Sequence, residues 1–431
     1  MERLDKNILF NLLSYTVVAL SGVAINVMIW SLYGTEVLGR FNLLFTFLII
    51  GAQLGVGGVQ FSVLRHNSAF RKRPRILGQV MTSALGVVTL FSFGVVASAW
   101  CGGDLLMAVW SEYAPVEGTV LLAPAVILFA WNKILLMGVN GIGYMRAFAF
   151  FNAQRFVLLM VCVFGFYLLN GPVSQIALVF VLTEAVMTLC MGGYFFMKAV
   201  TPAWPTVAWV RRHVGFGLRG FGGGALMEIN TRTDILMLGI MMSERAVGIY
   251  SFASTIAEGF AQLFTVLKNN VDPLFGEALF RRNIIRVNEV IAGVRRKYVP
   301  LLVLAGGAVI AGFPFLFSLV ITNDSEGLGE SWHVLVILIA FMGLASVYKP
   351  FSGLLNQMGK PGTFSWVITS TLALNVGLNL LLIPLWGLYG AALATGAAFF
   401  VESFFLYNVA KRHCLRMERR EEVEEGRNGD D

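Results

Sequence analysis

The sequence predicts an all-α polytopic membrane protein with about twelve transmembrane helices, arranged as two pseudo-symmetric six-helix lobes around a central cavity. Three observations predict this fold class. The chain of 431 residues is 57% hydrophobic and only 13% charged, whereas a soluble domain is about 25% charged. Its apolar runs have the length of membrane-spanning helices and lack the alternating pattern of a membrane β-barrel. Its two halves also share residue patterns at a nearly constant offset, as transporters built from internal repeats do.

Each predicted span is near the length of about 20 residues that a hydrocarbon core of about 30 Å requires. The first span follows a short charged N-terminus. We interpret it as a retained helix because it is longer than a signal-peptide core and no small-residue cleavage site follows it. The twelve predicted spans are 8–32, 37–63, 77–100, 119–141, 148–169, 173–197, 215–241, 247–268, 298–321, 332–356, 362–383 and 387–410.

The distribution of charge predicts that both termini are cytoplasmic. In this orientation the inside segments hold 25 of the 32 lysines and arginines, whereas the outside loops hold only Arg40 and Arg245. The outside loops also carry acidic residues, which are Glu36, Asp104, Glu112, Glu117, Glu244, Asp324, Glu326 and Glu330. The predicted parts are an N-terminal lobe at 1–200, a cytoplasmic linker at 201–214, a C-terminal lobe at 215–410 and a charged cytoplasmic tail at 411–431.

The seventh span, 215–241, is unusual because it contains Arg219, Glu228, Arg232 and Asp234. A charge at the centre of a membrane helix costs about 2.5–3.5 kcal/mol on insertion scales, so these residues are expected to face a polar path. Glu228 and Arg232 are four residues apart on a continuous helix, which fits either a neutralising ion pair or a polar lining. The three glycines at 222–224 fit either close helix packing or a hinge for alternating access.

The internal repeat has two parts. Gly39 and Gln53 match Gly248 and Gln262 at an offset of 209 residues. A second pattern at an offset of 216 joins the fourth and tenth spans. Its matches are Lys133 with Lys349, Asn140 with Asn356, Gly143 with Gly359, and Phe148 with Phe364. Because the direction across the membrane is the same in both halves, the lobes are expected to be related by an axis along the membrane normal.

The two repeat-related lysines are predicted to lie at mid-membrane depth. Lys133 and Lys349 each precede, by ten residues, a glycine near the cytoplasmic end of their span, which corresponds to about 15 Å of helix. A lysine stem reaches the headgroups from this depth only with difficulty, although snorkelling stays an alternative. We expect the two ammonium groups to face each other across a central cleft suited to an anion. Pro350 predicts a local helix break beside Lys349.

Other charged residues within the spans complete the candidate site. The candidates for substrate binding are Lys133, Lys349, Arg219, Arg232, Arg155, Asn140 and Asn356. The candidates for proton coupling are Asp234, Glu258, Glu184 and Glu402, because a carboxyl group in a membrane interior can exchange protons near neutral pH. Ion pairing of these acids with arginines is the structural alternative. The four cysteines have no metal-ligand spacing, so neither a metal nor a cofactor is predicted.

Several stretches resemble the polysaccharide flippases of the multidrug/oligosaccharidyl-lipid/polysaccharide exporter superfamily. They cover nearly the whole chain. They are Asn11-Leu-Leu-Ser through Tyr33-Gly-Thr-Glu-Val-Leu-Gly39-Arg-Phe, Thr233-Asp234-Ile-Leu-Met-Leu-Gly239, Val247-Gly248-Ile-Tyr-Ser-Phe-Ala253, Asp272-Pro273-Leu274-Phe275, and Asn379-Leu-Leu-Leu-Ile-Pro384-Leu-Trp-Gly387-Leu-Tyr-Gly390-Ala-Ala-Leu-Ala394-Thr.

This resemblance implies a flippase in the bacterial cytoplasmic (inner) membrane. Its implied substrate is an undecaprenyl-diphosphate-linked oligosaccharide for O-antigen (lipopolysaccharide), capsule or exopolysaccharide, moved to the outer leaflet by ion-coupled alternating access. Membrane lipids and polysaccharide assembly proteins are the other implied partners, and nucleic acid is not. The chain departs from a purely cationic lumen, because five basic and five acidic residues lie within the spans.

Two other functions fit parts of the sequence. A proton- or sodium-coupled small-molecule or multidrug antiporter of the same fold would use an acidic cavity, and Asp234, Glu258 and Glu402 keep this alternative open. A membrane enzyme such as a polysaccharide polymerase would need a sizeable loop with catalytic carboxylates or histidines. No predicted outside loop exceeds about 20 residues, and the sequence has neither an Asp-x-Asp motif nor a phosphate-binding glycine loop. We therefore predict a transporter and not an enzyme.

Overall fold

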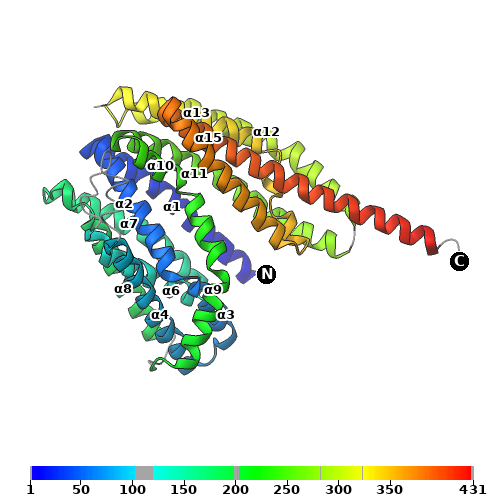
Figure 1. Cartoon of the computed structure of the whole chain (residues 1–431), viewed down its shortest axis with the longest axis horizontal. Helices are drawn as coiled ribbons and strands as arrows, with labels where there is room; N and C mark the ends of the chain where they lie inside the picture. Colours follow the sequence, from blue (N-terminus) through cyan, green and yellow to red (C-terminus); the bar gives the residue numbers. More distant parts are fainter. Residues whose placement is uncertain are drawn as a thin grey trace. The chain divides into compact units, whose positions relative to one another are not determined.

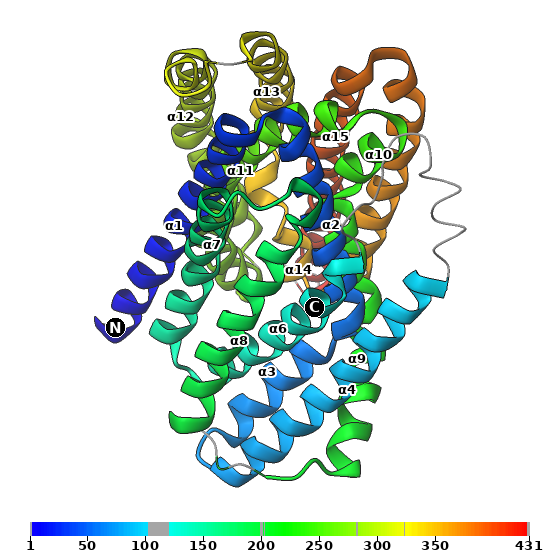
Figure 2. The ribbon, with the colours of Figure 1, turned by 90° about the vertical axis from the view of Figure 1, so that its left-hand side faces the viewer.

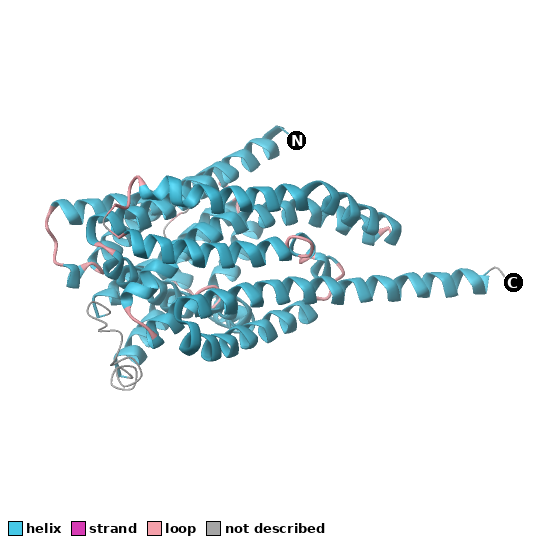
Figure 3. Ribbon diagram, turned by 90° about the horizontal axis from the view of Figure 1, so that it is seen from above, coloured by secondary structure: helices cyan, strands magenta, loops and turns pink. Residues whose placement is uncertain are grey.

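The computed structural model describes the backbone of residues 2–101, 120–198, 201, 203–281, 283–322 and 324–428. Every regular element in this part of the chain is helical (Figures 1 and 3). Nine helices within it are long and apolar enough to cross a membrane, and one of them, Gly362–Leu415, contains two predicted spans. The predicted all-α polytopic fold class is confirmed. The predicted outside residues Asp104, Glu112 and Glu117 lie outside the described residues.

Internal contacts divide the chain into two compact units, Met1–Ser251 and Phe252–Asp431. The helices of the first unit are α1 (Glu2–Tyr33), α2 (Thr35–Val56), α3 (Val59–Phe70), α4 (Pro74–Cys101), α6 (Ala123–Ile142), α7 (Met145–Leu168), α8 (Leu178–Lys198), α9 (Val207–Asn230), α10 (Thr233–Met241) and the start of α11 (Glu244–Phe280). The division falls beyond the predicted linker at 201–214 because α9 packs on α2, α3 and α4. The predicted lobe boundaries stay a prediction.

The second unit contains the rest of α11 and four further helices. These are α12 (Ile284–Ser318), α13 (Ser325–Ala345), α14 (Leu354–Gln357) and α15 (Pro361–Asn428). The long α15 carries the last two predicted spans and part of the tail, and it is broken at Gly387, whose φ is 57° and ψ −132°. A core of buried apolar side chains joins the end of α11 and the start of α12 to α14 and α15, with Phe275, Val287, Phe351 and Leu355 fully buried.

Three predicted spans are interrupted, and the breaks correct their boundaries. The span expected at 37–63 ends at Val56, because Gly57 and Gly58 adopt left-handed φ values of 55° and 77° and separate α2 from α3. The span expected at 332–356 ends at Ala345 and continues as the 3-10 turn Lys349–Phe351, as Pro350 predicts. The continuous helix expected at 215–241 is wrong, since residues 231–232 separate α9 from α10.

The repeat-related glycines Gly39 and Gly248 pack directly against each other where α2 crosses α11. A Cβ atom on Gly39 would overlap the carbonyl oxygen of Glu244, and a Cβ atom on Gly248 would overlap the carbonyl oxygen of Thr35. Thr35 and Glu244 are themselves separated by the repeat offset of 209. A reciprocal contact of this kind is what a local two-fold axis produces. Beside the crossing, Arg40 Nε lies 3.1 Å from Glu244 Oε1.

The first half of α9 is fixed to α3 and α4 by a buried histidine, and α9 runs beside both helices (Figure 2). His213 Nδ1 lies 3.0 Å from Ser62 Oγ, and its Nε2 lies 3.1 Å from the carbonyl oxygen of Val80. Burial lowers the pKa of His213 to about 4, and burial likewise lowers the pKa of neighbouring His66. One turn further along, Gly217 lies in backbone contact with the Gly57–Gly58 break.

Candidate functional site

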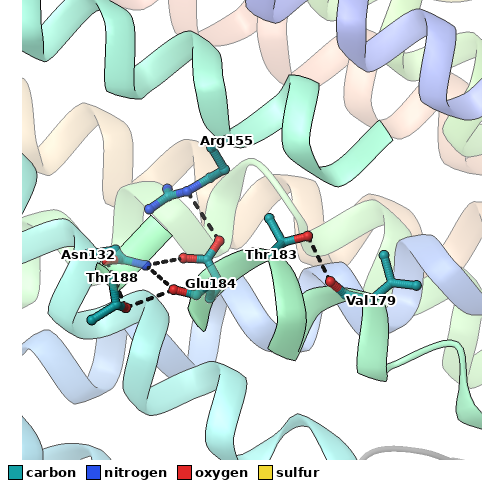
Figure 4. Close-up of polar contacts among 6 residues, drawn as sticks. All are labelled: Asn132, Arg155, Val179, Thr183, Glu184 and Thr188. Atoms are coloured by element: carbon teal, nitrogen blue, oxygen red, sulfur yellow. Dashed lines mark hydrogen bonds and ion pairs between the residues drawn. The ribbon is translucent and has the colours of Figure 1, made fainter. Parts of the chain in front are cut away.

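Helices α6, α7 and α8 bring together a network of buried polar side chains centred on Glu184 (Figure 4). The side chain of Arg155 on α7 places its Nε 3.2 Å from Glu184 Oε1. Asn132 on α6 donates its amide N–H to Glu184 Oε2 at 2.8 Å, and the Thr188 hydroxyl donates to Asn132 Oδ1 at 3.0 Å. Glu184 is only 2% exposed. The carboxylate is therefore held by a cation and an amide at the same time.

The guanidinium group of Arg155 has unused hydrogen-bonding capacity. Its Cζ lies 4.2 Å from the centroid of the Phe129 ring, a cation–π geometry. Its Nη2 atom is buried and has no hydrogen-bond partner among the described residues. A buried guanidinium N–H without an acceptor is costly unless a ligand supplies one. Since the guanidinium fork matches phosphate and carboxylate oxygens, this atom could bind an anionic group.

Lys133 lies on α6, one residue after Asn132, and its ammonium group has a different set of partners. Its Nζ donates to the side-chain oxygen of Gln53 on α2 at 2.7 Å. Its nearest carboxylate is Glu228 Oε2 on α9, at 3.6 Å. Its Nζ also lies 5.5 Å from the centroid of Phe129, the ring that Arg155 covers. The first unit thus gathers two cations, two carboxylates and one phenyl ring in a single region.

The second unit contains a simpler arrangement around Lys349. The Nζ of Lys349 lies 2.7 Å from Glu402 Oε1 on α15, so the two groups form both a hydrogen bond and an ion pair. The same ammonium group lies 4.3 Å from the centroid of the Phe399 ring. Lys349 begins the 3-10 turn that interrupts the predicted tenth span. The cleft that Lys133 and Lys349 are predicted to share stays a prediction.

A third polar feature is the buried carboxylate of Asp234 in the first turn of α10. It accepts hydrogen bonds from the hydroxyl of Tyr250 on α11 and from the backbone N–H of Ile235. Asp234 is 7% exposed. Arg232, just before α10, places its guanidinium carbon 5.8 Å from the centroid of the Phe45 ring. The Asp234 carboxylate is therefore stabilised by neutral donors as well as by the start of the helix.

The other predicted site residues have more local surroundings. Because the seventh span is broken after Asn230, the continuous-helix geometry assumed for Glu228 and Arg232 is wrong, and Glu228 pairs with Lys133 instead. Glu258 is exposed on α11. The side chain of Arg219 lies outside the described residues.

Asn140 and Asn356 occupy equivalent helix ends. Asn140 is half-buried and Asn356 is exposed. The backbone carbonyl of Asn140 accepts from the N–H of Gly143, and that of Asn356 from the N–H of Gly359. Both glycines adopt left-handed φ, at 86° and 69°. The repeat pattern at these positions therefore has a structural basis, the same helix-ending turn in both halves.

Sequence reasoning missed the residues that position the charges. Asn132 and Thr188 were not predicted, although an asparagine directly before Lys133 in an apolar span was an available signal. Gln53 appeared only as part of the repeat, and its role as the acceptor of the Lys133 ammonium needed the packing of α2 on α6.

No protein-family model matches the sequence, and no curated protein matches it. Solved structures do match. A multidrug resistance MATE family transporter of the MOP superfamily, in an inward-facing conformation, has a TM-score of 0.78 and 16% identity over 93% of this chain and 95% of that one. The lipid II flippase MurJ, in an inward closed conformation, has a TM-score of 0.76 and 14% identity over 95% and 90%.

A third similar structure is a MOP superfamily transporter from Pyrococcus furiosus Vc1. It has a TM-score of 0.64 and 15% identity over 95% of each chain, and that transporter is described as having a binding pocket of reverse polarity that suggests a different function. These likenesses, at low identity, show the fold of this chain. It is the fold of the MOP superfamily transporters, a fold that a protein named as a multidrug resistance transporter and a protein named as a lipid II flippase have in common.

Proposed function

We propose that this chain is an alternating-access membrane transporter that flips a diphosphate-linked lipid oligosaccharide from the cytoplasmic to the outer leaflet. The observation that carries the proposal is the buried cation cluster of the first unit, in which Arg155 has an Nη2 atom without a partner and Lys133 lies beside it over the same ring. A diphosphate carries about two negative charges and cannot cross hydrocarbon unaided. Two cations in a partly exposed interior site supply the compensation it needs.

The geometry supports an anionic headgroup more than a cationic drug. Glu184 is occupied by Arg155 and Asn132, so it does not offer a free carboxylate to a cation. The guanidinium of Arg155 and the ammonium of Lys133 offer N–H donors, which a diphosphate accepts at several oxygens. In this proposal the sugars occupy the polar path and the polyprenyl tail stays in the lipid. Arg219, Arg232 and Lys349, with Asn140 and Asn356, are secondary candidates for contacts along the path.

Coupling to a proton gradient is the proposed energy source. Glu402 and Glu184 each neutralise a cation, so protonation of either would release Lys349 or Arg155. Asp234 is a third candidate. It lies in the short helix α10, directly after the break, and it accepts a hydrogen bond from the Tyr250 hydroxyl on α11. Glu258 is a fourth candidate on sequence grounds. The proposed location is the bacterial inner membrane with both termini cytoplasmic, in association with polysaccharide assembly proteins.

An antiporter of small molecules is the second candidate function. The buried carboxylate of Asp234 favours it, as does the similarity to multidrug transporters. The two functions differ in the charge of the transported group. An antiporter for cationic drugs would need Asp234 for binding and would tolerate loss of Lys133, whereas the proposed flippase needs Lys133 and Arg155.

The test uses the full-length chain reconstituted in vesicles with a fluorescent polyprenyl-diphosphate oligosaccharide and a leaflet-specific quencher. We expect flipping by the wild type, loss in Lys133→Ala and in Arg155→Gln, and little change in Arg281→Ala, a matched control whose exposed side chain pairs with Glu277. Wild-type protein that exchanges cationic dyes but not the lipid would support the antiporter. Depletion in the host should in parallel cause lipid-linked oligosaccharide to accumulate on the inner leaflet.

A further inference from the structure

We infer that Glu228 is an internal counter-ion that occupies the anion position on Lys133 until the anionic group of the substrate displaces it. This inference rests on the proposed function, because it deepens the role of the same site. It assigns to one carboxylate on α9 the selection of anionic over neutral substrates. It also links arrival of the substrate to release of the end of α9, at the break within the seventh span.

The first observation is that Glu228 is the loosest of the three carboxylates paired with cations inside the spans. Glu402 lies 2.7 Å from Lys349, within hydrogen-bond distance. Glu184 lies 3.2 Å from Arg155 and accepts a second hydrogen bond, from Asn132. Glu228 lies 3.6 Å from Lys133, beyond hydrogen-bond distance, with its side chain 31% exposed. Among the three carboxylates, Glu228 therefore has the longest contact to its cation and the largest exposed fraction.

The second observation is that Lys133 is positioned without Glu228. Its hydrogen bond goes to the neutral amide oxygen of Gln53 on α2 at 2.7 Å, while the ring of Phe129 lies beneath it. Departure of Glu228 would leave the ammonium group in the same place with an open coordination position. A site that keeps its geometry when its internal anion leaves is suited to exchange one anion for another.

The third observation is the location of Glu228 in the last turn of α9. The helix ends at Asn230, and the chain restarts as α10 at Thr233. The hydroxyl of Thr231 donates to the backbone carbonyl of Glu228 at 2.8 Å and closes this end. The ion pair to Lys133 thus ties the end of α9 to α6. Because a break follows directly, release of Glu228 frees the end of α9 without requiring α10 to move.

The net charge of the cluster also favours displacement of Glu228 by the substrate. Lys133 and Arg155 carry two positive charges, and Glu184 and Glu228 carry two negative ones. A diphosphate that entered with both acids in place would make the cluster strongly negative. If it replaces Glu228, which then moves away, the net charge of the cluster is about −1 instead of about −2, so displacement removes part of the repulsion. Neutral and cationic molecules cannot make this exchange. The balanced charge of the spans is therefore compatible with an anionic substrate.

The experiment measures binding of geranyl diphosphate to the full-length protein in lipid nanodiscs by calorimetry. We expect Glu228→Gln to bind about fivefold more tightly than the wild type, the scale of one partly exposed ion pair. Glu228→Asp should fall between the two, because a shorter carboxylate lengthens the pair. Glu289→Gln, which removes an exposed acid paired with Arg286, is the matched control and should bind as the wild type does.

The gain must also depend on Lys133. In the Lys133→Gln background, the change Glu228→Gln should give no increase in affinity. If the wild type binds and Glu228→Gln binds equally or more weakly, the inference is wrong while the proposed function stands. If neither binds geranyl diphosphate, the proposed function fails, and the inference fails with it. If Glu228→Gln does not fold, the affinity of Glu228→Asp for geranyl diphosphate is compared with that of the wild type instead, and tighter binding by the variant is the expected result.

Discussion

Lys133 in the first unit and Lys349 in the second occupy repeat-related positions but have different electrostatic surroundings. Both ammonium groups lie over a phenyl ring, Phe129 in one case and Phe399 in the other. Lys349 is neutralised by direct contact with Glu402 at 2.7 Å. Lys133 instead hydrogen-bonds an amide and has its nearest carboxylate at 3.6 Å. The first unit thus keeps a cation available for a ligand, and the second does not.

The difference follows from one arginine. The acid of the first unit, Glu184, is held by Arg155. The position at the same repeat offset from Arg155 is Thr371, whose hydroxyl donates to backbone carbonyls of its own helix. With no second cation there, the carboxylate of Glu402 pairs with the lysine. An extra cation in one half therefore takes over the local acid and leaves the lysine with a looser partner, Glu228, and this predicts distinct roles for the two halves.

The largest expected effect is on stability, and it comes from removing Arg155. Arg155→Ala leaves the carboxylate of Glu184, which is 2% exposed, without its cation, and breaking a buried pair in this way costs about 3–5 kcal/mol. Arg155→Met combined with Glu184→Gln should recover most of the stability, because no charge is then left unpaired. Thermal unfolding in detergent measures both. Equal stability of the single and double variants would show that the pair is not coupled.

The second prediction compares the two lysines in flipping. Lys133→Ala should lower the flipping rate by about 10–100-fold, the loss expected for a charge-assisted hydrogen bond to substrate. Lys349→Met combined with Glu402→Gln should lose less flipping activity than Lys133→Ala and should change its pH dependence, since this pair is proposed for coupling. Flipping of the fluorescent lipid across a range of pH tests both. Equal loss in the two variants would contradict the division of roles.

The third prediction concerns a place where the halves should behave alike. Gly39→Ala and Gly248→Ala should each destabilise the protein by about 1–3 kcal/mol, because either Cβ atom overlaps a backbone carbonyl oxygen that cannot move without shifting a helix. Gly86→Ala is the matched control, since a Cβ there meets nothing within 4 Å. Similar losses at the two glycines, measured by thermal unfolding, would support a local two-fold relation. A large loss at only one would weaken it.

The sequence predicts most of the spans because the bilayer imposes one length on apolar runs, but it misses the breaks within 37–63 and 215–241. It also identifies Lys133, Lys349 and Glu184 as charges inside the spans. The hydrogen-bond and ion-pair partners of these charges could not be predicted, since they depend on which helix faces pack together. Glu228 is the clearest example. No glycine or proline marks the break at residues 231–232, so the sequence indicates a continuous helix and pairs Glu228 with Arg232. The structure pairs it across α9 and α6 with Lys133.

The smallest expected effect is on the pH dependence of stability, and it comes from His213 on α9. At the repeat offset of 209, the residue equivalent to His213 is Leu4, so only the second half has a titratable group here. Neutral His213 satisfies both ring nitrogens, on Ser62 and Val80, and burial lowers its pKa to about 4. The unfolded chain, with a histidine pKa near 6.5, takes up the proton first as pH falls.

Stability should therefore decrease as pH falls from about 6.5 toward 4, by roughly 0.7 kcal/mol between pH 7 and pH 6. His213→Gln should be less stable at pH 7 but should lose most of this slope, because the titrating group is gone. His333→Gln, which changes an exposed histidine on α13, should keep the slope. Thermal unfolding at several pH values gives the comparison. A slope that persists in His213→Gln would assign the pH dependence to other groups, the first of which is His66 in ring contact with it.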